Sequence, residues 1–124
     1  MIWKINNRWT KRQTGNEFER IAEQFLLEKG LQLIQRNFSC KLGELDLIMQ
    51  EGETLVFIEV RYRKSSAFGG SEASVSATKQ KRFIRTAQLY LQQKHGNRPP
   101  MCRFDVIAIS GDNTNWIKNA FYAN

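Results

Sequence analysis

Acidic and basic side chains alternate with apolar ones in two short segments near the middle of the chain. Glu44 and Asp46 stand at alternate positions of the first segment. The second segment carries, again at alternate positions, Glu59, Arg61 and Arg63. Because the side chains of a β-strand point alternately to its two faces, each set shares one face of its strand, and Leu45 and Leu47 share the opposite face of the first. An antiparallel hairpin would bring Asp46 and Glu59 together beside a cationic side chain.

Two carboxylates on rigid strands can bind a divalent metal ion. Mg²⁺ prefers oxygen ligands and typically takes one or two carboxylates together with water and substrate oxygens. Asp46 and Glu59 would supply the carboxylates of a Mg²⁺ or Mn²⁺ site, and the carbonyl of Val60 is a candidate third ligand. Arg61 would project from the same face towards a phosphate. A metal held in this way can activate water for the hydrolysis of a phosphodiester.

The same pattern also fits a purely structural hairpin. Charged residues at alternate positions can form the solvated face of two strands, with ion pairs between the strands. The apolar run at residues 55–58 argues against this, because a strand covered on both faces would place Asp46 and Glu59 at the rim of buried structure. Clustered acids in such a place need a cation or another partner. Spacing alone leaves both interpretations open.

The elements that would position these residues follow from the apolar periodicity of the chain. A helix is expected after Gly15-Asn16, ending at Lys29-Gly30. We expect the other elements at residues 31–38, 43–49 and 54–63 (strands), 78–93 (helix), 103–109 (strand) and 113–120 (a short edge element with Trp116 inward). The order α-β-β-β-α-β, with a helix between two apolar strands, predicts a right-handed crossover and parallel pairing. The predicted fold is therefore an α/β fold, a mixed sheet flanked by helices.

Length and charge limit the class of protein and its partners. The chain has 124 residues and a net charge of +7, which is typical of one small domain that meets a polyanion such as nucleic acid. We expect a basic N-terminal segment at residues 1–14 and a single domain at residues 15–124. No apolar run is long enough to cross a bilayer, so no membrane partner and a cytoplasmic location are expected. Cys40 and Cys102 form no C-x-x-C pair, which disfavours a zinc site.

Several of these residues together resemble a known family. The motifs are Gly15-x-x-Phe18-Glu19-x-x-Ala22-x-x-Phe25-Leu26, Gly43-Glu44-Leu45-Asp46-Leu47-Ile48, Phe57-Ile58-Glu59-Val60-Arg61-Tyr62-Arg63 and Arg103-Phe104-Asp105-Val106. They look like the YraN family of small bacterial proteins (uncharacterised protein family 0102). The resemblance extends to archaeal Holliday-junction resolvases and to restriction-endonuclease-like PD-(D/E)xK nucleases. It implies a restriction-endonuclease-like core, in agreement with the element order above.

The resemblance implies a role for individual residues. Asp46 and Glu59 match the two metal-binding acids, and Glu19 matches a helical acid that helps to complete the site in the resolvases. As an alternative, Glu19 could be an exposed acid that interacts favourably with the helix dipole. Lys79-Gln80, which opens the second helix, matches a substrate-facing position.

Arg61 departs from the nuclease pattern, which has a lysine at this position. Arginine stays protonated, so it cannot accept a proton from the attacking water. It can still bind a phosphate through two parallel hydrogen bonds. The departure therefore favours binding over cleavage.

The expected function is that of a metal-dependent, nuclease-like protein that binds structured or branched DNA. The residues expected to contact flanking phosphates are Arg63, Lys64, Lys79, Gln80, Lys81 and Arg82. One alternative is a catalytically inactive nucleic-acid-binding module on the same fold, and another is a small basic protein-interaction domain. Resolvases of similar fold act as dimers, so the resemblance also implies a homodimer.

Overall fold

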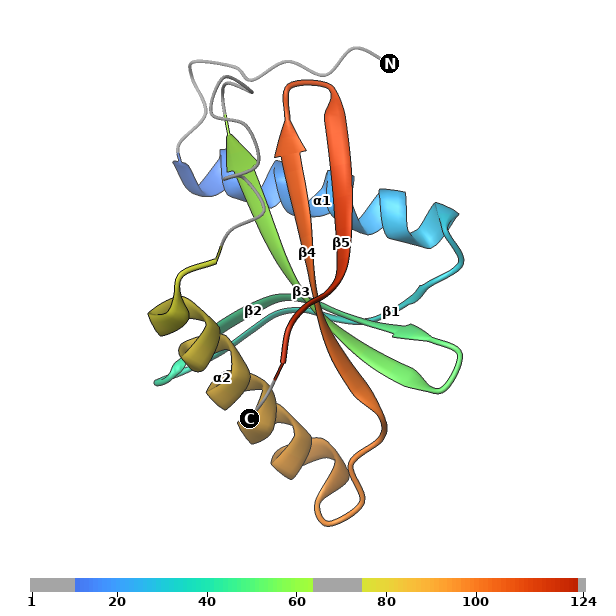
Figure 1. Cartoon of the computed structure of the whole chain (residues 1–124), viewed down its shortest axis with the longest axis vertical. Helices are drawn as coiled ribbons and strands as arrows, with labels where there is room; N and C mark the ends of the chain where they lie inside the picture. The colour runs from blue at the N-terminus through green and yellow to red at the C-terminus, as the bar shows by residue number, and fades with distance from the viewer. Residues whose placement is uncertain (1–10, 64–74, 123–124) are drawn as a thin grey trace.

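The computed structural model describes residues 11–63 and 75–122, in which two helices flank a five-stranded mixed sheet (Figure 1). The elements are α1 (Lys11–Glu28), β1 (Gln32–Cys40), β2 (Gly43–Glu51), β3 (Thr54–Arg63), α2 (Ala77–His95), β4 (Cys102–Ser110) and β5 (Asn113–Phe121). The predicted mixed α/β fold is confirmed and is consistent with a restriction-endonuclease-like core. The expected edge element is a full strand, β5, and α1 begins at Lys11, ahead of its predicted start.

The strands lie side by side in the order in which they occur in the chain, β1-β2-β3-β4-β5. β1 with β2, β2 with β3, and β4 with β5 pair antiparallel, whereas β3 and β4 pair parallel. Parallel neighbours cannot be joined by a tight turn, so α2 crosses between them over one face of the sheet. In the described residues no helix is long and apolar enough to span a membrane.

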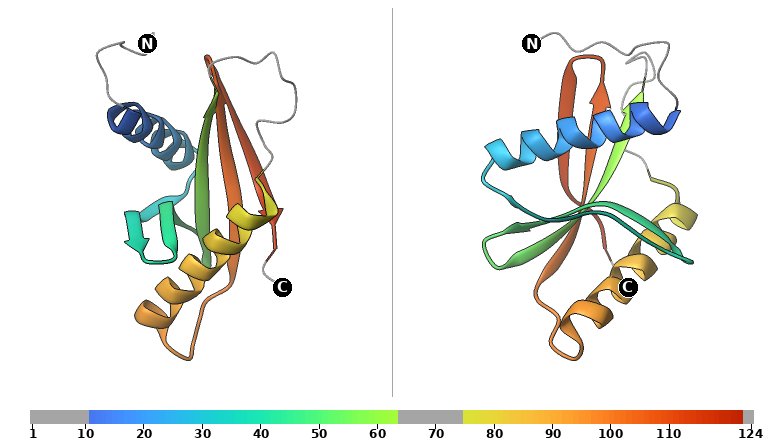
Figure 2. Two further views of the ribbon diagram at one scale, coloured as in Figure 1. Left: turned by 90° about the vertical axis from the view of Figure 1, so that its left-hand side faces the viewer. Right: turned by 180° about the vertical axis from the view of Figure 1, so that it is seen from behind.

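The two helices cover opposite faces of the sheet, α2 in front and α1 behind in the view of Figure 1, and α1 in front in the right-hand view of Figure 2. Phe18, Ala22 and Leu26 of α1 recur every fourth residue and are buried against one face. Phe83 and Tyr90 of α2 are buried against the other face. Both faces of the central strands are therefore apolar and covered.

The predicted alternation of β2 is wrong at one point. Leu45 packs in the core beneath α2, whereas Leu47 packs in the core beneath α1, so these two residues do not share a face. In β1, Leu45 pairs with Phe38 and Leu47 pairs with Arg36. The residue between these two partners is Asn37, whose φ of 53° is left-handed. Asparagine tolerates this conformation better than most residues, so β1 can be irregular at the point that faces Asp46. The alternation of β2 breaks at the same level of the sheet.

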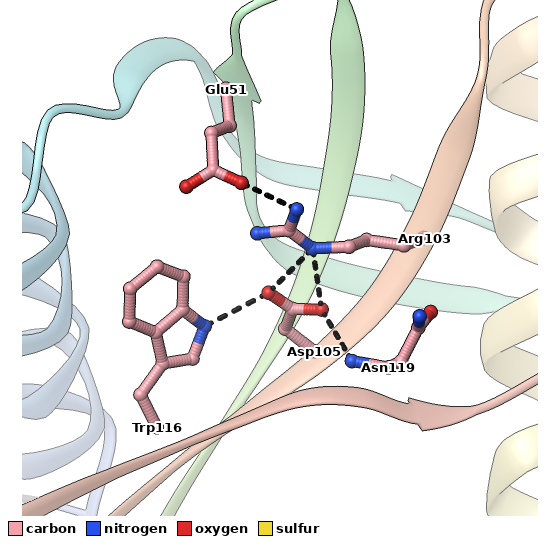
Figure 3. Close-up of polar contacts among 5 residues, drawn as sticks. All are labelled: Glu51, Arg103, Asp105, Trp116 and Asn119. Atoms are coloured by element: carbon pink, nitrogen blue, oxygen red, sulfur yellow. Dashed lines mark hydrogen bonds and ion pairs between the residues drawn. The ribbon is translucent and has the colours of Figure 1, made fainter.

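A polar network secures the β4–β5 pair on the α1 side (Figure 3). The carboxylate of Asp105, fully buried, accepts hydrogen bonds from Arg103 Nε at 3.1 Å, Trp116 Nε1 at 2.9 Å and the backbone N–H of Asn119 at 3.0 Å. Arg103 Nη1 also pairs with Glu51 of β2. Asp105 therefore has a structural pairing with Arg103, and the expected inward position of Trp116 is confirmed.

Removing the carboxylate of Asp105 should destabilise the fold strongly. Asp105→Ala leaves the Arg103 guanidinium, an indole N–H and a backbone N–H without their acceptor in the interior, and we expect a loss of about 3–5 kcal/mol in the free energy of unfolding. Urea denaturation measures it. Glu28→Ala, which removes an exposed acid at the end of α1, is the control and should change stability by about 0.5 kcal/mol or less. A loss below about 1 kcal/mol for Asp105→Ala would contradict the importance of the network.

Candidate functional site

β2 and β3 separate just where their acidic residues begin. Their ladder runs from Glu51↔Thr54 to Leu47↔Ile58 and stops there. Asp46 is the next residue on β2, and Glu59 is the next on β3. The Oδ2 atom of Asp46 accepts a hydrogen bond from the backbone N–H of Val60 at 2.8 Å. A side-chain carboxylate thus satisfies a backbone donor that the ending ladder leaves without a strand partner.

A cavity of about 360 Å³ opens at this point between the two strands and the start of α2. Its lining residues are Gly43, Glu44, Asp46, Glu59, Val60, Lys79, Arg82 and Phe83. Acids of β2 and β3 therefore face cations of α2 across one small space. The two acids that the sequence pattern singled out, Asp46 and Glu59, lie in the same cavity.

Lys79 forms an ion pair with one of these acids. Its Nζ atom lies 2.7 Å from Oε2 of Glu59, whose side chain is only 6% exposed, while the Lys79 side chain is 54% exposed. The backbone N–H of Lys79 donates to the side chain of Ser76, the N-cap of α2, so the first turn of the helix is fixed. The ammonium at the acids thus comes from the helix and not from the strand.

Burial and mutual repulsion shift the protonation of Asp46. Loss of hydration and the neighbouring charge of Glu59 raise the pKa of the Asp46 carboxyl to about 8, against the opposing effect of the hydrogen bond from Val60. Burial leaves the acid pair with reduced hydration, so a cation beside it lowers the cost of its charge.

Glu19 approaches the same acids from the α1 side of the sheet. It borders a separate cavity of about 790 Å³ beside α1 and β1, together with Asn37. Burial, followed by the charge of Glu44, raises the pKa of Glu19 to about 7, and a hydrogen bond with Asn37 opposes the rise. Glu59 contributes to the same shift. Glu19 therefore shares the electrostatic field of the acid pair but lines a different cavity.

The polar residues of α2 expected to face a substrate divide into two groups. Lys79 and Arg82 line the acidic cavity. Gln80 instead donates from its side chain to the carbonyl of Val75, in the segment that leads into the helix. Lys81 is exposed and does not line the cavity.

The basic residues of β3 contribute less to the cavity than the sequence pattern indicated. Arg61 is half-buried, pairs with Ala108 of β4 and is not among the lining residues. The side chain of Arg63 and all of Lys64 lie outside the described residues. The sequence analysis did not predict the ion pair of Lys79 with Glu59. One indication was present: the first turn of α2 contains a lysine and no acidic residue, which favours an anion from outside the helix.

The acid pair fits a metal that needs few protein ligands. Among the described residues, no three Asp, Glu, His or Cys side chains are placed together so as to hold a metal ion. The carboxylates of Asp46 and Glu59 would offer oxygen ligands only, which suit Mg²⁺ or Mn²⁺ and not a soft metal. Val60, whose carbonyl is the expected third ligand, lines the same cavity. Each carboxylate has one oxygen engaged, by Val60 N–H and by Lys79 respectively.

Comparison with known proteins identifies the family. The model of "Uncharacterised protein family UPF0102" matches residues 18–109, a range that contains every residue lining the acidic cavity. The chain belongs to family UPF0102. This is the YraN family, so the resemblance seen in the motifs is confirmed.

Curated UPF0102 proteins match almost the whole chain. A UPF0102 protein of Janthinobacterium sp. (strain Marseille) is 50% identical over 119 residues, covering 96% of this chain and 95% of the relative. One from Pseudomonas syringae pv. syringae (strain B728a) is 50% identical, covering 92% and 97%. One from Herminiimonas arsenicoxydans is 53% identical over 112 residues, covering 90% and 89%.

Gly43 lets the β1–β2 turn approach α2 closely. Its φ of 151° is in the range that favours glycine, and a Cβ atom there would lie 3.2 Å from the Thr86 hydroxyl oxygen. That hydroxyl donates to the carbonyl of Arg82, so it is not free to move away. Gly43 therefore permits the close approach of the β1–β2 turn to α2 beside the acid pair.

Gly43→Ala should cost more stability than the same change at a glycine without neighbours. We expect a loss of about 2–3 kcal/mol from backbone strain together with the contact to Thr86. Gly52→Ala is the matched control, because Gly52 has a φ of 60° but open space around it, and strain alone should cost about 1 kcal/mol. Thermal denaturation of both variants measures the difference. Equal losses of stability in the two variants would show that the contact with Thr86 of α2 adds no cost at position 43.

The raised pKa of Asp46 makes stability depend on pH. Below about pH 4 the carboxyl is neutral whether the chain is folded or not. Between about pH 4 and pH 8 the unfolded chain releases this proton while the folded chain retains it, so stability falls as pH rises. Asp46→Asn removes this titration. The free energy of unfolding of the variant minus that of the wild type should therefore rise by about 1 kcal/mol or more from pH 5 to pH 8.5, as measured by urea denaturation. Glu53→Gln, at an exposed turn, should run parallel to the wild type at both values of pH. If the difference in the free energy of unfolding between Asp46→Asn and the wild type is the same at both values of pH, the raised pKa of Asp46 is contradicted.

Proposed function

We propose that this chain is a divalent-metal-dependent, nuclease-like protein that acts on structured or branched DNA. The observation that supports it most is the acid pair Asp46 and Glu59, placed where β2 and β3 part and facing Lys79 and Arg82 of α2. Hydrolysis of a phosphodiester by this route requires acids to bind a metal and cations to bind phosphate, and residues of both kinds line one cavity.

Each residue has a role in this proposal. Asp46 and Glu59, with the carbonyl of Val60, would hold Mg²⁺ or Mn²⁺. The bound ion would activate a water molecule and neutralise charge that develops on the phosphate. Glu19 would add negative charge from the α1 side, and Arg82 would bind a phosphate next to the one that reacts. The net charge of +7 would attract the polyanion.

A second candidate is a nucleic-acid-binding module that does not cut, and Arg61 favours it. A guanidinium on β3 cannot take a proton from water, and Arg61 does not line the cavity. In this candidate the acid pair would bind a metal that bridges to phosphate, without hydrolysis. The two candidates share a binding surface and differ only in turnover.

Cleavage of a four-way DNA junction and of a linear duplex of the same sequence tests the proposal. In Mg²⁺ or Mn²⁺ we expect the junction to be cut, and Asp46→Ala or Glu59→Ala should lower the rate by about 100-fold or more, since each removes a metal ligand. Glu53→Ala, an exposed acid in the turn between β2 and β3, should leave the rate unchanged.

Three outcomes separate the candidates. Tight, salt-sensitive binding without cleavage in either metal would reject the enzyme and favour the binding module. Failure to bind any nucleic acid at low salt would reject both and leave a protein-interaction domain. Cleavage that persists in Asp46→Ala and Glu59→Ala would place the activity elsewhere.

A further inference from the structure

Lys79 forms an ion pair with Glu59, one of the two carboxylates that the proposed metal site requires. Its ammonium lies 2.7 Å from Oε2 of Glu59, which is buried, whereas most of the lysine stem is exposed. A cation held by one flexible, exposed side chain can leave without any movement of the backbone. Competition between a metal and Lys79 for Glu59 rests on the proposed function, because it requires the metal site.

The position of Lys79 in α2 is unfavourable unless an anion lies nearby. The amino end of a helix carries partial positive charge, and the first turn of α2 contains no acidic residue to balance it. Lys79 adds a full positive charge there. Glu59 supplies the balancing negative charge in the folded chain. A phosphate group is the other kind of anion that a lysine at a helix amino end binds well.

We propose that Lys79 is an exchangeable internal cation that couples metal binding to phosphate binding. Without metal, its ammonium neutralises Glu59 and is not available to a substrate. A divalent ion shared by Asp46 and Glu59 balances both carboxylates, so the ammonium of Lys79 leaves Glu59 with its charge uncompensated and binds a phosphate oxygen of the nucleic acid. Coupling of this kind is reciprocal, so nucleic acid must also tighten the binding of the metal.

Neither neighbouring arginine can take this role. Arg82 lines the same cavity, but the structure gives it no ion pair with Asp46 or Glu59 within the described residues. Arg61 does not line the cavity. Lys79 is therefore the cation whose release depends on the metal.

Titration of the whole protein with Mn²⁺ by calorimetry at pH 8.5, without nucleic acid, tests the competition. Lys79→Met should bind Mn²⁺ about 5- to 20-fold more tightly than the wild type, because the competing ion pair is gone. Lys81→Met is the matched control: it removes the same charge from the same helix but from an exposed side chain that does not line the cavity, and its affinity should stay within about 2-fold of the wild type.

The outcomes distinguish this inference from the proposed function. Wild-type binding with no gain in Lys79→Met, or an equal gain in Lys81→Met, would overturn the role of Lys79 and leave the metal site in place. No binding of Mn²⁺ by any of the three proteins would overturn both.

Fluorescence anisotropy with a labelled DNA junction provides a second readout. Ca²⁺, chosen as an oxygen-binding ion, should increase the DNA affinity of the wild type. The ratio of the affinity with Ca²⁺ to the affinity without it should be about 5-fold or more greater in the wild type than in Lys79→Met. Lys81→Met should weaken DNA binding equally with and without the ion. An equal increase in the wild type and Lys79→Met would contradict the coupling.

Discussion

The site depends on one constraint, the separation of β2 from β3 after the pair Leu47↔Ile58. A continuous ladder would bury the two strands against each other and leave no space for a ligand. The separation creates a cavity, but it also leaves a backbone N–H of β3 without a strand partner. The carboxylate of Asp46 accepts a hydrogen bond from that N–H, so a residue that borders the cavity also satisfies the unpaired backbone donor. The side chain of Asp46 thus has a structural role at the point where the cavity opens.

Among the described residues, Asp105 and the pair Asp46 and Glu59 are acids withdrawn from solvent, and their surroundings differ. Asp105 receives hydrogen bonds from Arg103, Trp116 and Asn119, which satisfy it within the fold. Asp46 and Glu59 each receive only one such contact in the described residues, and burial raises the pKa of Asp46. Removing one partner from a buried, hydrogen-bonded charge is costly, so Asp105 fits a structural role, whereas a carboxyl group in a cavity with a shifted pKa is a candidate functional group.

Much of this architecture could be predicted from the sequence, because it follows from local periodicity. The apolar patterns predicted the helices, the strands and the parallel crossover, and the alternating acids predicted that Asp46 and Glu59 would lie close together. The rest depends on contacts between residues distant in the chain. The break in the alternation of β2 at Leu45 lies beside the left-handed Asn37 of the neighbouring strand, a contact that the sequence of β2 alone does not reveal. The approach of Lys79 to Glu59 arises from the packing of α2, which no local pattern encodes.

The incomplete ladder also determines how the arm that carries Asp46 is held. The β1–β2 hairpin forms ladder pairs with the rest of the sheet only from Leu47 to Glu51, whereas β3 and β4 pair along their length, from Leu55↔Cys102 to Arg63↔Ser110. Beyond the pair Leu47↔Ile58, Asp46 lies on the hairpin arm and Glu59 on the fixed strand. Contacts outside the ladder hold this arm: the hydrogen bond from the Val60 N–H to Asp46, the burial of Leu45 beneath α2, and the close approach of Gly43 to Thr86. The gap between the two carboxylates is therefore set by these contacts and not by strand pairing.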